Sequence, residues 1–145
     1  MNDAHLHLLV NHFPIIGTIF AFGILATAML LKNTTIKNVA YVLFVLVAIF
    51  GALSMATGEG AEEVVEELPA IGHQIIHEHE ELAEKLAILL YALGGFSVLG
   101  LYLNFKKNSK ETLISFIVLV LAVSSIFLAQ KVGTSGGEIR HTEIR

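Results

Sequence analysis

The chain has 145 residues, of which 54% are hydrophobic and 15% charged, and its formal net charge is −4. A soluble domain usually carries charge at about a quarter of its positions, so this composition favours a membrane protein. The absence of cysteine excludes disulfides, thiolate metal clusters and the covalent attachment of a c-type haem. No basic patch exceeds Lys106, Lys107 and Lys110, so we expect no nucleic-acid partner.

Four stretches are apolar without interruption and contain no Asp, Glu, Lys, Arg or His: residues 13–31, 39–57, 86–105 and 112–129. A helix needs roughly 17–25 such residues to cross a bilayer, and only a helix satisfies its backbone within a single span. Buried helices of a soluble bundle are the alternative, but they would leave almost no polar surface to face water. The sequence therefore predicts an all-α, polytopic protein, a bundle of four transmembrane helices in contact with lipid. Residues 1–145 form its single domain.

The N-terminal segment places His5, His7 and His12 just ahead of the first apolar stretch. Pro14 either kinks a helix that begins before it or is the first residue of a separate helix. At the edge of the hydrocarbon, His12 would cost about 1–3 kcal/mol for each nitrogen left buried and unpaired. We therefore expect His12 to be occupied by a metal or a haem, and the more exposed His5 to matter little.

The long connection between the second and third apolar stretches begins with apolar residues at helical spacing, with glutamates between them. This pattern is typical of a short amphipathic helix that lies on the membrane or caps the bundle, and Pro69 would end it. Its apolar positions are Ala61, Val64, Val65 and Leu68.

A second helical register in the same connection leads into the third apolar stretch. His73, His77, Glu80 or Glu81, and Glu84 share one face of it, whereas His79 points elsewhere. Two histidines four residues apart on a helix are a familiar pair of ligands for a divalent metal.

The C-terminal tail is rich in glycine. Gly133, Gly136 and Gly137 predict a sharp turn after the fourth apolar stretch. Such a turn would fold Glu138 and His141 back over the mouth of the bundle.

Charge differs strongly between the two sides of the predicted membrane. The short loops, residues 32–38 and 106–111, carry five lysines and one glutamate, whereas the other side carries twelve acidic and four basic residues. Lysine-rich short loops stay in the cytoplasm. We therefore expect a multi-pass protein of the bacterial inner (cytoplasmic) membrane with both termini in the periplasm. All seven histidines then share the periplasmic side, and this asymmetry is the main indication of function.

Two motifs, His7-x4-His12-Phe13-Pro14-Ile15 and Gly136-Gly137-Glu138, give the chain a family resemblance. It resembles an uncharacterised family of bacterial four-helix membrane proteins over the whole four-helix layout. The resemblance implies roles for His7, His12, Pro14, Glu138 and His141, and one of His73, His77 and His79 would supply the family's histidine at the start of the third helix. His141 lies closer to Glu138 than in the family pattern. A link to haem-binding membrane cytochromes is an analogy of layout.

Two kinds of bound group fit this cluster. Imidazole is the usual axial ligand of haem iron and a common ligand of other metals, and helical bundles accommodate cofactors between their helices. For a b-type haem the candidate ligands are His7, His12, His77, His79 and His141. For a zinc, copper or iron ion, the candidates are His12, His73, His77, Glu81, Glu138 and His141.

The favoured function is electron transfer through a b-type haem at the outer face, with quinone or a periplasmic redox partner. Binding of a non-haem divalent metal is the first alternative, and a structural or anchor subunit of a homo-oligomer or a larger membrane complex is the second. No Ser/His/Asp arrangement, phosphate loop or hydride-cofactor fingerprint is present. An electron carrier or binding subunit is therefore a better prediction than a stand-alone enzyme.

Overall fold

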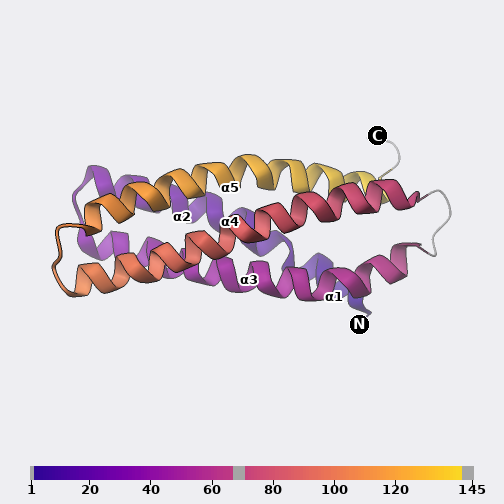
Figure 1. Ribbon diagram of the computed structural model, residues 1–145, viewed down its shortest axis with the longest axis horizontal. Coiled ribbons are helices and arrows are strands. Elements are labelled where there is room, and N and C mark those ends of the chain that lie inside the picture. The colour runs from indigo at the N-terminus through magenta and orange to yellow at the C-terminus, as the bar shows by residue number, and fades with distance from the viewer. Residues whose placement is uncertain (1, 67–70, 142–145) are drawn as a thin grey trace.

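The computed structural model describes residues 2–66 and 71–141, which form a long helical bundle (Figure 1). Its helices are α1 (Asp3–Val10), α2 (His12–Leu30), α3 (Thr34–Glu66), α4 (His73–Phe105) and α5 (Glu111–Arg140). Helices α2, α3 and α4 each pack against the next helix in the chain. In addition, α5 packs against α2, and α1 packs against α3. The predicted all-α bundle of four long apolar helices is confirmed, with α1 and α2 together forming the first of the four.

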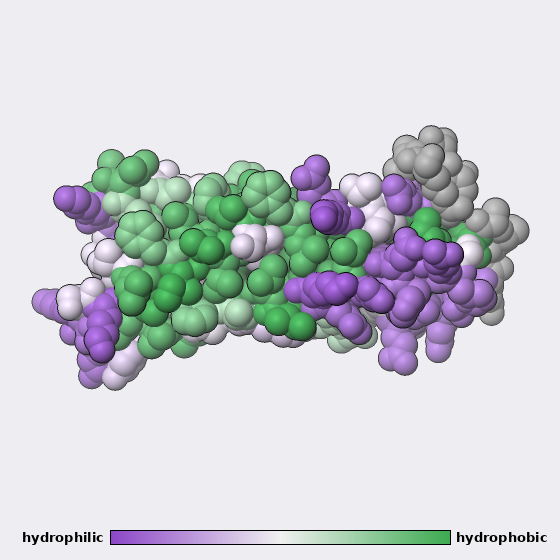
Figure 2. Space-filling view, turned by 45° about the horizontal axis from the view of Figure 1, so that its top comes forward, coloured by the Kyte–Doolittle hydropathy of each residue, from purple (hydrophilic) through white to green (hydrophobic). Residues whose placement is uncertain are grey.

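The helices are long and apolar enough to cross a membrane, namely Asp3–Leu30, Thr34–Glu66, His73–Phe105 and Glu111–Ile139. Large apolar side chains such as Phe20, Ile88 and Phe127 face outward. Figure 2 shows a broad apolar belt on one face of the bundle. This surface suits contact with lipid hydrocarbon.

Helices α3 and α4 exceed the length that a bilayer requires. Each has 33 residues, or about 50 Å, against about 30 Å of hydrocarbon. The excess lies at the end where both termini are found, which is strongly hydrophilic (Figures 1 and 2). We call this the histidine end, and the end formed by the two short loops the lysine end.

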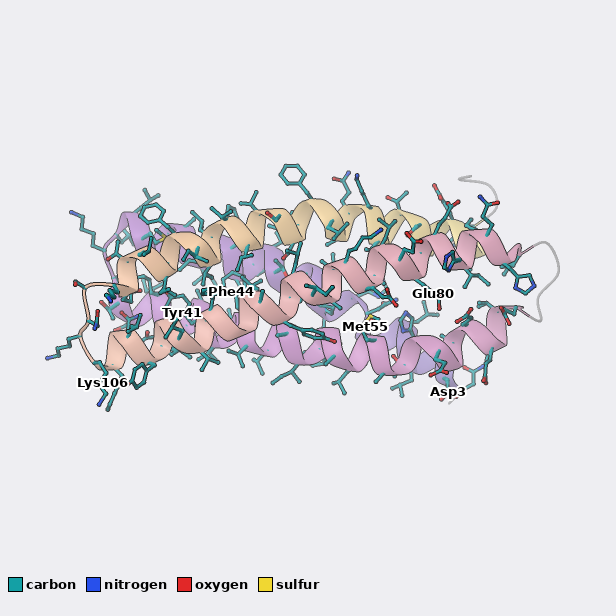
Figure 3. All side chains as sticks on the ribbon, viewed as in Figure 1. Asp3, Tyr41, Phe44, Met55, Glu80 and Lys106 are labelled. Atoms are coloured by element: carbon teal, nitrogen blue, oxygen red, sulfur yellow. The ribbon has the colours of Figure 1, made fainter. Side chains whose placement is uncertain are left out.

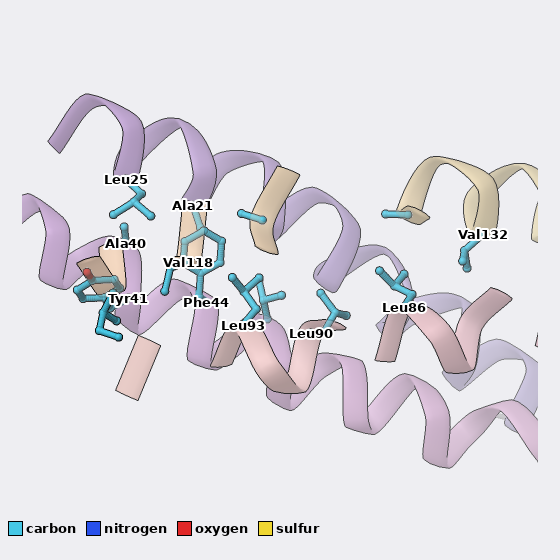
Figure 4. Close-up of a cluster of buried hydrophobic side chains, with 14 residues drawn as sticks. Ala21, Leu25, Ala40, Tyr41, Phe44, Leu86, Leu90, Leu93, Val118 and Val132 are labelled. Atoms are coloured by element: carbon cyan, nitrogen blue, oxygen red, sulfur yellow. The ribbon is translucent and has the colours of Figure 1, made fainter. Parts of the chain in front are cut away.

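The core is a column of side chains from all four long helices (Figure 4). Leu25, Phe44, Leu93 and Val118 are fully buried, one from each of α2 to α5. Glycines allow the helices to approach closely, as expected in membrane bundles. A Cβ on Gly94 would lie 2.6 Å from that of Ala48.

Gly100 is predicted to be indispensable for the packing of Tyr41. A Cβ at position 100 would lie 2.6 Å from the Cζ atom of Tyr41, whose ring is fully buried. Gly100→Ala should therefore lower the free energy of unfolding by about 1–3 kcal/mol, measured by denaturation of the detergent-solubilised protein. Gly95→Ala, on the same helix but with no atom within 4 Å of the new Cβ, should not destabilise. Equal effects would contradict the packing argument.

The first helix is interrupted at Asn11, three residues before Pro14. The amide of Asn11 still donates to the carbonyl of His7, at 2.9 Å. Because α2 begins at His12, Pro14 lies in its first turn, where the missing N–H costs no helical hydrogen bond. The sequence predicted either a kink at Pro14 or a helix that begins there. The observed break lies three residues earlier, at Asn11.

The prediction of a separate amphipathic helix in the outer connection is wrong for the described residues. Residues 61–66 continue α3 without a break, while Leu68 and Pro69 lie outside the described residues. The extension lies beside α1 and contacts α4, where Glu66 lies 3.0 Å from Nδ1 of His73. At Gly60, a Cβ would lie 2.8 Å from that of Asp3 on α1.

The predicted turn at the C-terminal glycines is also wrong. Helix α5 continues to Arg140, so Gly133, Gly136 and Gly137 are helical. Burial of Val132 and Ile139 keeps this last part of α5 against the bundle. Glu138 therefore continues along the helix instead of folding over the mouth.

Candidate functional site

All seven histidines lie at the histidine end, but only two of them turn toward the interior of the bundle. His7 on α1 and His79 on α4 are half-buried. The other five are exposed: His5, His12, His73, His77 and His141. Figure 3 shows the contrast between the two ends, with Asp3 and Glu80 at the histidine end and Tyr41 and Lys106 at the lysine end.

His7 ties α1 to α3 through its Nδ1 atom. This atom lies 3.1 Å from the carbonyl oxygen of Ser54 and 3.2 Å from Oγ1 of Thr57. A carbonyl oxygen can only accept, so Nδ1 carries the hydrogen and Nε2 keeps its lone pair. Gly58 lies beside the ring, and a Cβ there would be 3.8 Å from Cε1 of His7.

His79 is held in a similar way by α5. Its Nδ1 lies 2.9 Å from Oγ of Ser135, and that hydroxyl donates its own hydrogen to the carbonyl of Val132, at 3.1 Å. The hydroxyl oxygen is thus left as an acceptor, so His79 donates through Nδ1 and keeps the lone pair on Nε2. The ring packs closely on Gly136, where a Cβ would lie 3.0 Å from Cε1.

Both inward histidines are favoured in the neutral form. Burial lowers the pKa of His79, and the charge of nearby His7 lowers it further. Burial also lowers the pKa of His7, with a smaller contribution from His12, against the opposing hydrogen bond to Ser54. Both residues lie beyond the apolar stretches. Neutral imidazole is the form that binds metals.

Acidification is expected to loosen the histidine end. Because the pKa of each inward histidine is lowered in the folded state, the unfolded chain binds more protons as the pH falls below about 6.5. The stability that these residues contribute is fully present above this pH and is lost below it. Amide hydrogen exchange in α1, corrected for intrinsic rates, should accelerate between about pH 7.5 and about pH 5.5. In the double variant His7→Gln, His79→Gln, the exchange rate should depend much less on pH. If exchange in the unmodified protein is the same at both pH values, the prediction is contradicted.

His12 does not occupy the buried position that the sequence predicted. Its ring is exposed, and Nδ1 bonds to the carbonyl of Leu8 one turn earlier, at 3.0 Å. The argument from unpaired buried nitrogens therefore does not hold for this residue, because water or lipid headgroups can reach it.

The acidic histidine face of α4 is present but lies on the surface. His77 Nε2 is 3.5 Å from a carboxylate oxygen of Glu81, and His73 Nδ1 is 3.0 Å from one of Glu66 on α3. Glu138 and His141 are at the end of α5 and have contacts of their own. Across residues 2–66 and 71–141, no group of three His, Asp or Glu is arranged to hold a metal ion. The six predicted metal ligands are thus not brought together there.

A buried polar network at the lysine end was missed by the sequence analysis. Glu111, at the start of α5, accepts hydrogen bonds from Lys37 (2.5 Å), Tyr41 (2.9 Å) and Ser115 (2.8 Å). It is 6% exposed. The sequence could have predicted this network. Glu111 is the only acidic residue among the five lysines of the short loops, and an ionisable residue at a membrane boundary usually pairs with an opposite charge.

Comparisons with family models, curated proteins and solved structures gave no match for this chain. The chain is a four-helix protein with four long apolar helices, and its site is interpreted from its own geometry. That geometry offers two neutral imidazoles from separate helices, each with one nitrogen held by the protein and the other able to bind a ligand.

Proposed function

We propose that this protein is a membrane-embedded electron carrier whose redox metal, most simply the iron of a b-type haem, is bound by His7 and His79. The proposal rests on the hydrogen bonds of the two imidazole rings. Each Nδ1 is bonded to acceptors on a neighbouring helix, which is how histidines that bind metals are usually oriented. Each Nε2 is then available for the metal.

The donor set fits haem iron better than a free metal ion. Zinc, copper or non-haem iron would require three or four protein donors, whereas a porphyrin supplies four nitrogens and leaves the axial positions to the protein. Gly58 and Gly136 keep side chains away from the edges of both rings. The haem would supply one-electron chemistry, and the protein would hold and orient it.

Charge supports an orientation for this function. The lysine end carries the short basic loops and would be cytoplasmic by the positive-inside rule, as in a bacterial inner membrane. The histidine end, with both termini, would then face the periplasm. There the centre could exchange electrons with quinone or with a periplasmic redox partner.

The visible spectrum of the detergent-purified full chain, together with its metal content, tests the proposal. We expect a Soret band that sharpens on reduction, and His5→Ala should retain it because His5 is exposed. A colourless protein that contains zinc, copper or iron would support the non-haem alternative. Protein free of haem and metal, even after growth with both supplied, would contradict the proposal and favour a structural or anchor subunit.

A further inference from the structure

The molecule consists of two helical hairpins with the same turn. The first hairpin is α1 and α2 followed by α3, and the second is α4 followed by α5. Each turn contains a lysine with left-handed backbone, Lys32 (φ 51°) and Lys107 (φ 52°). In each, the next residue donates its amide to the carbonyl five residues earlier, Asn33 to Ala28 at 2.9 Å and Asn108 to Leu103 at 3.0 Å. Both helices therefore end in the same Schellman motif, with lysine instead of the usual glycine in the left-handed position.

The two hairpins also hold their histidines in the same way. In each hairpin the imidazole ring contacts three residues of the second helix. They are a backbone carbonyl, a hydroxyl three residues later in the chain, and a glycine directly after the hydroxyl. The Ser135 hydroxyl donates to that carbonyl, at 3.1 Å. The Thr57 hydroxyl donates its hydrogen either to that carbonyl, at 3.1 Å, or to the carbonyl of Leu53 one residue earlier, at 3.0 Å. The triplets are Ser54, Thr57 and Gly58 for His7, and Val132, Ser135 and Gly136 for His79.

The spacing along the chain agrees with this correspondence. His7 lies 25 residues before Lys32 and Thr57 lies 25 residues after it, while His79 and Ser135 lie 28 residues on either side of Lys107. The difference of three residues is close to one helical turn. Each hairpin thus carries one half of a site at a similar distance from its turn.

We infer that His7 and His79 are equivalent halves of one pseudo-symmetric site that takes a single haem iron through both imidazoles, with Thr57 and Ser135 as matching positioning residues. This inference rests on the proposed function and adds to it the equivalence of the two ligands and the two residues that position them. Each hydroxyl has committed its hydrogen to a backbone carbonyl, so toward the ring it can only accept. It therefore fixes Nδ1 as the protonated nitrogen and makes Nε2 the more basic ligand atom.

Titration of the detergent-purified, haem-free full chain with hemin tests the inference. The wild type should give a six-coordinate, low-spin spectrum. His7→Ala and His79→Ala should each give a five-coordinate, high-spin species with similarly weakened binding, and the double variant should bind no hemin specifically. Added imidazole should restore the low-spin spectrum of each single variant, which shows that the variant is folded.

The positioning residues are tested in the same assay. Thr57→Val and Ser135→Ala should each keep six-coordination, weaken hemin binding by about 10–100-fold and shift the midpoint potential in the same direction. Ser124→Ala is the matched control, because the Ser124 hydroxyl is exposed and bonds only to its own helix at Val120. It should change neither quantity.

The outcomes separate the inference from the proposed function. Hemin binding that depends on only one of the two histidines, or a high-spin wild type, would overturn the inference and with it the assignment of both ligands, whereas the electron carrier itself would still stand because hemin is bound. Binding of zinc or copper ions without binding of hemin would overturn the inference and support the non-haem alternative. A wild type that binds neither hemin nor these ions would overturn both.

Discussion

Glu111→Leu is expected to destabilise the bundle by about 3–5 kcal/mol, the largest stability effect of any substitution considered for this chain. The carboxylate accepts hydrogen bonds from Lys37, Tyr41 and Ser115. The side chains of Lys37 and Glu111 are only 12% and 7% exposed. Removal of the carboxylate leaves the ammonium of Lys37 without its counter-charge in a poorly hydrated position, which costs far more than the loss of a surface pair.

A double variant distinguishes this explanation from a simple loss of packing. Lys37→Met combined with Glu111→Leu removes both charges and should recover most of the lost stability, since buried ion pairs can often be replaced by apolar side chains. Tyr41 and Ser115 would keep their mutual hydrogen bond of 2.8 Å. Unfolding in detergent micelles measures both variants. Glu81→Ala, which removes the exposed partner of Lys85, is the control and should have little effect. If the double variant is no more stable than Glu111→Leu, the unpaired charge is not the cause.

Gly136→Val is expected to weaken hemin binding by at least about tenfold while the bundle stays folded. Even the first carbon of a side chain at this position would lie 3.0 Å from Cε1 of His79 and 3.4 Å from Nδ1. The ring must move away, and its hydrogen bond to Ser135 would be lost with it. The proposed haem site would then lose one of its ligands.

Gly133→Val is the matched control for this substitution. It introduces the same β-branched side chain one turn earlier on α5, where a Cβ would lie 3.9 Å from Ile15, an ordinary contact. Hemin titration and size-exclusion profiles of the two variants should differ only in binding. Equal loss of binding would mean that the helix end, rather than His79, is sensitive to valine.

The sequence predicts the membrane architecture well because its signal is compositional. Uninterrupted apolar stretches such as residues 39–57 and 112–129 require helices in lipid whatever their neighbours are. The common location of the histidines follows from counting spans. These conclusions do not depend on how one helix is rotated against another.

Local glycine and amphipathic patterns were less informative at the histidine end. Gly133, Gly136 and Gly137 were interpreted as turn formers, yet they belong to α5, and Gly136 serves as the surface on which His79 lies. Residues 61–66 were interpreted as a separate surface helix, yet they continue α3, and their apolar side chains are only half-buried. In both cases tertiary packing decides between two structures that the local sequence allows.

The choice of inward-facing histidines also depends on long-range contacts. His79 was expected to point away from the face shared by His73 and His77, and it does, but only the structure shows that it points to α5. His7 finds its partners 47 and 50 residues away on α3. Among the five candidate haem ligands, sequence reasoning singled out His12 because it lies at the edge of the first apolar stretch, but its ring is exposed in the structure.

The excess length of the helices has an electrostatic consequence for any charge change at the inward histidines. His79 lies seven residues before Leu86, the first residue of its apolar stretch, which is about 10 Å of helix. A charge at the centre of the hydrocarbon is expensive, by several kcal/mol or more. Above the hydrocarbon boundary, water and salt screen a charge within a Debye length of about 8 Å. A centre held there can gain or lose an electron without a compensating charge inside the membrane.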